Sequence, residues 1–157
     1  MLNEKKSFHI AKEQALYLLK YRDYSKKELF DKLKKANPEE FAQMAIEYLE
    51  ELGLIDDERF AKKYVYDLVH FKRFFGQRLK YELQRKGIDS VIIDEVLDDL
   101  DVEPSDQITK IINKKYPRAL LNEKDRRRAI DACRRMGYSW DDIKNTLNHM
   151  EKCNDEI

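Results

Sequence analysis

Few side chains in this 157-residue sequence stand at a spacing that supports catalysis or metal binding. The three histidines, His9, His70 and His149, lie far apart and lack the short spacing of metal ligands, so we expect surface or structural roles for them. The adjacent carboxylates Asp56 and Asp57 diverge at a predicted helix start, where capping is favoured over coordination. Four glycines are too few for a phosphate-cradling loop. The sequence therefore predicts a protein that is not an enzyme and has no catalytic residues, metal or cofactor.

The two cysteines and the single tryptophan are interpreted as structural side chains. Cys133 falls at an apolar position of a helical pattern, which predicts a core thiol, and Cys153 lies in a polar tail, so no disulfide is expected. Trp140 is predicted to be a core anchor, with base stacking as the alternative. The N-terminus lacks the apolar segment of a signal peptide, and no apolar run approaches the ~20 residues of a membrane span. These features predict a reducing, cytoplasmic setting without membrane contact.

A repeat with a period of 50 residues organises the chain. Two apolar positions and one position suited to a helix end recur at this interval, in three sets: Leu29, Leu79 and Ala129; Leu33, Leu83 and Cys133; Asn37, Gly87 and Gly137. Each copy contains three segments with apolar residues at helical spacing, and no segment alternates with period two for long enough to suggest a strand. We therefore predict an all-α fold of three tandem three-helix repeats, stacked into a curved, elongated array.

Predicted helix caps divide the chain. Ser7 is expected to cap the first helix, and Ser25 and Glu28 have the spacing of a capping box, in which each side chain satisfies a backbone amide of the other residue. The segments that these caps delimit are repeat 1 at residues 7–55, repeat 2 at residues 56–104, repeat 3 at residues 105–150, and a frayed tail at residues 151–157. The chain as a whole is expected to be a monomer.

The connection between the first two repeats is predicted to be a helix–turn–helix joint with a structural role. A glycine permits the positive φ that ends one helix, two apolar residues fill the seam between repeats, an aspartate caps the next helix and an aromatic ring packs behind it. The residues of this joint are Gly53, Leu54, Ile55, Asp56, Asp57 and Phe60. The buried stripe of the helix that follows is predicted to comprise Phe60, Tyr64, Leu68 and Phe71.

Charge alternates with the same period. Residues 61–88 carry 8 basic and 2 acidic side chains, residues 89–106 carry 8 acidic and no basic ones, and residues 107–137 carry 10 basic and 3 acidic ones. The opposite charges either attract one another within the fold or form a bipolar surface for a partner of mixed charge, such as a nucleoprotein filament. The basic ridge predicted to contact a partner or DNA comprises Lys62, Lys63, Lys72, Arg73, Arg78, Lys80, Arg85, Lys86, Arg126, Arg127, Arg128, Arg134 and Arg135.

Four segments between residues 11 and 150 match the motifs of a known family. The most distinctive is Gly53-Leu-Ile-Asp56-Asp57-Glu-Arg-Phe60-Ala61, which follows Leu49-Glu-Glu-Leu52. The other three likenesses are Tyr24-Ser25-Lys-Lys-Glu28-Leu29 with Leu33; Gly76, Leu79 and Leu83 with Lys86-Gly87-Ile88; and Arg134-Arg135-Met136-Gly137-Tyr138-Ser139 with Ile143 and Leu147.

These four segments resemble the RecX family, and the resemblance implies a non-catalytic regulator. Members of the RecX family bind along the groove of the RecA filament on single-stranded DNA, and they damp strand exchange, ATP turnover and the co-protease activity that drives the SOS response to DNA damage. The resemblance therefore implies a role in regulating DNA repair and recombination. The implied partner is the RecA filament, and the implied contact with single-stranded DNA is made through that filament, with weak direct binding of DNA compatible with this role.

A helical module that binds DNA phosphates directly is the alternative function. Two arginine clusters, at residues 126–128 and 134–135, lie on one predicted helix, with Lys114 and Lys115 nearby in sequence. Such clusters hold phosphates without reading bases. The segment 71–75, in which three phenylalanines flank two cations, is interpreted either as a packed corner between helices or as an exposed contact loop.

Overall fold

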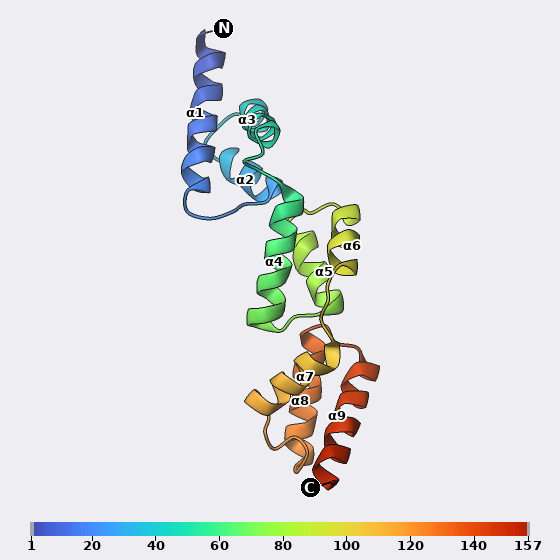
Figure 1. Cartoon of the computed structure of the whole chain (residues 1–157). Coiled ribbons are helices and arrows are strands. Elements are labelled where there is room, and N and C mark those ends of the chain that lie inside the picture. The colour runs from blue at the N-terminus through green and yellow to red at the C-terminus, as the bar shows by residue number, and fades with distance from the viewer. Residues whose placement is uncertain (1, 157) are drawn as a thin grey trace. The chain divides into compact units, whose positions relative to one another are not determined.

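The computed structural model describes residues 2–156, and this part of the chain forms helices and short connections without any strand. The predicted all-α fold class is therefore confirmed. None of the helices over residues 2–156 has the length and apolarity needed to cross a membrane. The helices of this range are α1 (Leu2–Leu19), α2 (Lys26–Leu33), α3 (Glu39–Glu51), α4 (Asp57–Lys72), α5 (Gly76–Arg85), α6 (Ser90–Asp98), α7 (Pro104–Lys115), α8 (Glu123–Arg135) and α9 (Trp140–Asp155) (Figure 1).

The helices form two compact units, and α4 and α5 contribute residues to both. The first unit runs as far as Tyr64 and includes Leu83–Leu97. In this unit α1 packs against α2 and α3 (Figure 1), because small residues on α1 let the helices approach closely. Ala11 and Ala15 are fully buried there against the apolar stripes of α2 and α3, whose buried leucines are Leu29, Leu33 and Leu49.

The second unit comprises Val65–Glu82 and the chain from Asp98 onward. In this unit α7 packs against both α8 and α9 (Figure 1). Ile108 on α7 and Ile143 on α9 are fully buried in its core, together with the thiol of Cys133 on α8. Burial raises the pKa of that thiol to about 11, since an apolar setting disfavours the thiolate. The predicted core role of Cys133 is therefore confirmed.

Capping side chains set the helix starts as the sequence predicts. The Ser25 hydroxyl accepts a hydrogen bond from the Glu28 amide at 3.2 Å, and the Glu28 carboxylate accepts one from the Ser25 amide at 3.3 Å. At the start of α4, the Asp56 carboxylate accepts from the backbone amide of Arg59 at 3.1 Å. Asn122 caps α8 in the same way, because its side-chain oxygen accepts hydrogen bonds from two backbone amides of the first turn. These bonds satisfy amides that the helices leave without a partner.

The two ends of the chain are more helical than the sequence pattern predicts. Ser7 does not cap α1, because α1 begins at Leu2 and Ser7 lies within it. The preceding residues include glutamate and lysine, which favour helix, and Glu4 complements the positive end of the helix dipole. At the other end, α9 continues to Asp155, so the helix extends into the segment expected to be frayed. Ile157 lies outside the described residues.

Three apolar side chains assigned to the interior are exposed instead. Phe71 is 79% exposed, because it follows the fully buried Val69 by two positions and so lies about 200° round α4. Leu54 is 45% exposed while Ile55 is buried, so only one of these neighbours fills the seam. Trp140 is 50% exposed, because it is the first residue of α9 and its side chain leans toward the open end of the helix.

Candidate functional site

The connection between α4 and α5 is held in a strained conformation. Arg73, the residue after α4, has φ of 61°, a left-handed value that costs a non-glycine residue roughly 1–2 kcal/mol. The Tyr138 hydroxyl donates to the Arg73 carbonyl at 2.6 Å, and the Phe75 amide donates to the Met136 carbonyl at 2.8 Å. The rings of Phe75 and Tyr138 also stack, with centroids 5.4 Å apart. Strain that is maintained by surrounding contacts is common at functional sites.

Tyr138 is well suited to hold this connection. Burial raises the pKa of its hydroxyl well above the ordinary range, so the group keeps its proton and remains a donor. On the other side, the Arg73 guanidinium donates to the side-chain oxygen of Gln107 at 2.9 Å, and Gln107 is itself buried on α7. Arg73 is therefore fixed at both its backbone and its side chain, by elements of the second unit.

A hollow of about 850 Å³ lies in the second unit beside this connection, and α7 forms its other wall. Cations and aromatic rings dominate its lining, and none of the residues that line it carries a carboxylate. A concave surface with charge of one sign concentrates its electrostatic field and attracts ligands of opposite charge. We call this surface the basic hollow; its cations are Lys72, Arg73, Lys110, Lys114 and Lys115, its phenyl rings are Phe71 and Phe74, and His70 also lines it.

The two rings of the basic hollow have different roles. The Phe74 ring is covered by the Arg78 guanidinium, 4.4 Å from the ring centroid, and Lys72 lies 5.8 Å from the same centroid. Phe71 instead exposes 79% of its surface at the edge of the hollow. The structure therefore contains both alternatives left open for this segment, since its later residues form a packed corner and Phe71 forms an exposed contact.

The arginines of α8 divide into two groups. Arg126 faces α9 and forms an ion pair with Glu151, with only 25% of its side chain exposed. Arg127 and Arg128 are exposed and lie within 3.7 Å of carboxylates on their own helix. Arg134 and Arg135 are also exposed, in the last turn of the helix. Attraction within the fold therefore accounts for Arg126, while the other four arginines are accessible to a partner.

Most of the remaining cations of the predicted ridge form ion pairs within the protein. Lys62 pairs with Glu58 on α4, and Lys63 pairs with Asp23 at 3.1 Å. Lys80 and Arg85 are exposed on α5. Arg78 pairs at 3.1 Å with the buried Glu82, and Lys86 donates to Glu28 at 2.9 Å. Arg78 and Lys86 therefore contribute to packing within the fold.

The joint around Gly53 has the geometry of a structural element. Gly53 has φ of 74° and follows the end of α3. Ile55 and Phe60 are buried, and Asp56 caps α4. The Asp57 carboxylate accepts a hydrogen bond from the Lys26 amide at 2.9 Å, so it caps α2 rather than its own helix. These contacts give the residues of the joint structural roles, in the core or at a helix end.

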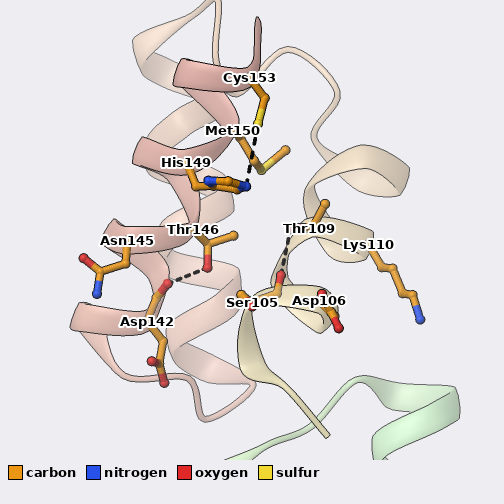
Figure 2. A pocket seen from close by; sticks show the side chains of 10 residues that line it. All are labelled: Ser105, Asp106, Thr109, Lys110, Asp142, Asn145, Thr146, His149, Met150 and Cys153. Atoms are coloured by element: carbon orange, nitrogen blue, oxygen red, sulfur yellow. Dashed lines mark hydrogen bonds between the residues drawn. The ribbon is translucent and has the colours of Figure 1, made fainter.

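A second hollow, of about 690 Å³, lies between α7 and α9 (Figure 2). His149 and Cys153 project from one face of α9, with the imidazole Nε2 3.6 Å from the thiol sulfur. The hydroxyls of Thr109 and Thr146 donate to backbone carbonyls of their own helices. Within residues 2–156, no group of three or more His, Cys, Asp or Glu side chains is arranged to hold a metal ion.

Lys110 contributes to the basic hollow although the charge pattern does not single it out, and Lys114 and Lys115 stand out in the sequence only as neighbours of the arginine clusters. A signal was present, because Lys110 and Lys114 are four residues apart and so share one face of α7. What the sequence did not indicate is that this face lies beside Lys72 and Arg73.

Over residues 2–156 the helices pack through apolar stripes and carry cations on their surfaces, which defines an all-α protein with cationic surfaces. Comparisons with known proteins agree. Models of the first and second three-helix domains of RecX match residues 11–49 and 56–97. The chain is 33% identical over 150 residues to the regulatory protein RecX of Chlorobium phaeobacteroides, covering 94% of this chain and 95% of that protein.

Two further relatives give the same result. The regulatory protein RecX of Clostridium tetani is 31% identical over 156 residues, covering 96% of this chain and 71% of the relative. The crystal structure of RecX from Lactobacillus salivarius has the same fold, with a TM-score of 0.81, 22% identity and coverage of 94% of this chain and 98% of that chain. The chain belongs to the RecX family of regulatory proteins, which are non-catalytic.

Proposed function

We propose that this protein binds the RecA filament on single-stranded DNA and restrains its recombinase, ATPase and co-protease activities. The observation that carries the proposal is that relatives named regulatory protein RecX align with 94–96% of this chain. Binding of this kind regulates DNA repair and recombination. It requires no reaction at the protein's own surface. We propose that the protein acts as a monomer that binds the filament in the bacterial cytoplasm.

The proposed contact surface is cationic. It comprises four exposed arginines of α8 and the basic hollow. Their positive charge complements a nucleoprotein filament, which presents both carboxylates and phosphates. The planar guanidinium of arginine binds either group through two parallel hydrogen bonds. The four arginines are Arg127, Arg128, Arg134 and Arg135.

Capture of the protein by three different baits tests the proposal. The baits are RecA filament assembled with nucleotide on immobilised single-stranded DNA, free RecA, and the DNA alone. We expect the filament to retain the protein best and to keep it as salt is raised, because shape and apolar contact add to charge. Retention by DNA alone that equals retention by the filament would instead support a DNA-binding module.

A further inference from the structure

We propose that the basic hollow binds a segment of single-stranded DNA, with its cations on the phosphates and the exposed ring of Phe71 stacked on a base. The inference rests on the proposed function for its setting, because the RecA filament supplies such DNA. The binding itself is a property of the isolated chain. It therefore can be tested without RecA.

The charge of the hollow favours a polyanion. Five cations line it from two elements of the second unit, and none of the lining residues carries a carboxylate to neutralise them. Lys114 and Lys115 lie in the last turn of α7, where they also complement the helix dipole. Lys72 does the same at the end of α4. The helix dipoles do not account for Arg73, which follows α4, or for Lys110, which lies before the last turn of α7.

The aromatic ring at the edge of the hollow favours a nucleic acid among polyanions. Phe71 leaves 79% of its surface exposed, although it belongs to a helix whose other face is well buried. Binding of single strands combines a cationic groove with aromatic rings on which bases stack, because every base has a flat face. An acidic protein segment would engage the cations but has no need of the ring.

The backbone beside the ring supports the same assignment. Arg73 keeps a left-handed φ of 61° because Tyr138 holds its carbonyl, and its guanidinium is oriented by Gln107. The connection therefore presents a cation in a fixed position two residues after Phe71. A site prepared in this way loses less conformational entropy when a ligand binds.

The test is fluorescence anisotropy of a labelled oligothymidylate titrated with the whole protein, with variants at the ring and at the cations. Phe71→Ala removes the ring, and Phe71→Tyr keeps it. A double variant, Lys114→Gln with Lys115→Gln, removes two cations of the hollow. Its matched control is Lys144→Gln with Lys152→Gln, which removes two exposed cations of α9 outside the hollow. Leu121→Ala, at a side chain 84% exposed, controls for loss of apolar surface.

We expect Phe71→Ala to weaken binding about five- to 150-fold, as loss of one stacked base does, and Phe71→Tyr and Leu121→Ala to bind like the wild type. The hollow double variant should weaken binding, and the dependence of log affinity on log salt should become less steep by about 0.7 for each phosphate that the variant no longer neutralises. The control double variant should change the affinity much less.

Two kinds of result would overturn the inference. One is a failure in the DNA titration itself, either no oligothymidylate binding by the wild type or equal binding by all variants. The other is unchanged oligothymidylate binding together with weaker capture by the RecA filament, which would assign the hollow to an acidic segment of the partner protein. In that second case the proposed binding to the RecA filament survives. A failure of the DNA-site inference can therefore be distinguished from a failure of the proposed function.

Discussion

The backbone amide of Phe75 donates a hydrogen bond to the carbonyl oxygen of Met136 at 2.8 Å. Fifty residues earlier in both partners, the Ser25 hydroxyl donates to the carbonyl oxygen of Lys86 at 2.7 Å. α2, α5 and α8 are the middle helices of successive groups of three. In each case the start of one middle helix, α2 or α5, meets the glycine that ends the next middle helix, α5 or α8. The period of 50 in the sequence is therefore matched by a joint that each unit contains once.

Gly137, at the second of these joints, and Gly53, at the connection between α3 and α4, should differ in their tolerance of a side chain. Gly137 has φ of 104°, and a Cβ atom there would lie 1.9 Å from the Phe75 carbonyl oxygen. Gly53 has φ of 74° with nothing within 4 Å of the corresponding position. We expect Gly137→Ala to lower the free energy of unfolding by at least about 3 kcal/mol, through strain and a backbone clash, and Gly53→Ala by about 1 kcal/mol. Urea denaturation measures both, and equal losses would contradict the close approach at Gly137.

Glu28 should give the first joint a dependence on pH. Burial alone would raise the pKa of this carboxyl, but hydrogen bonds from Lys86, the Ser25 amide and Arg22 outweigh burial and lower the pKa below its usual 4.5. A depressed acid pKa stabilises the fold above the unfolded value, and this stabilisation is lost as pH falls through the folded value. Glu28→Gln should therefore cost roughly 1–2 kcal/mol at pH 7.

Paired denaturation curves of the wild type and Glu28→Gln across pH measure this effect. The difference in the free energy of unfolding should be constant from neutral pH down to the usual carboxyl range and should shrink at lower pH. A difference that grows on acidification would show that the carboxylate does not stabilise the joint.

Much of the fold could be predicted from the sequence because its determinants are local. The capping box at Ser25 and Glu28 and the stripe through Leu29 and Leu33 involve residues within one or two turns, so spacing is sufficient to identify them. Phe71 and Trp140 also match the helical period, but each lies in a terminal turn of its helix with its side chain exposed. Periodicity alone does not reveal this. The repeat boundaries 7–55, 56–104 and 105–150 stay predictions.

The candidate site was harder to predict than the fold. Lys72 and Arg73 were recognised as cations, but Lys110 lies about forty residues away and belongs to another helix. Which helix faces meet is decided by tertiary packing, and a single sequence carries little trace of it. Likewise, Arg126 differs from the other arginines of α8 because it pairs with Glu151 on α9. The charge pattern along the sequence does not show which arginine faces α9.

The two thiols should react at very different rates. The Cys133 thiol is fully buried with a pKa of about 11, whereas Cys153 is exposed. Since the thiolate is the reactive form, we expect one thiol to react quickly with a disulfide reagent at mildly alkaline pH and the second only after denaturation. Cys153→Ser should remove the fast phase, and a fast phase that survives in this variant would place Cys133 outside the core.

The exposed arginines of α8 should contribute to filament binding and not to folding. Replacing Arg127, Arg128, Arg134 and Arg135 with alanine should weaken filament capture by about 1–4 kcal/mol if the contacts add, because each exposed contact contributes about 0.2–1 kcal/mol. The matched control is Arg126→Ala, which breaks the pair with Glu151 and should lower the melting temperature while leaving capture nearly unchanged. Full capture by the quadruple variant would move the interface elsewhere.

The most direct test of the central claim is the rate of ATP hydrolysis by RecA on single-stranded DNA, measured as this protein is titrated into preassembled filaments. We predict that the rate falls with added protein and reaches a plateau, and that the quadruple arginine variant requires higher concentrations for the same effect. A rate that stays constant at concentrations where the filament has captured the protein fully would contradict the proposal that this RecX-family protein restrains RecA.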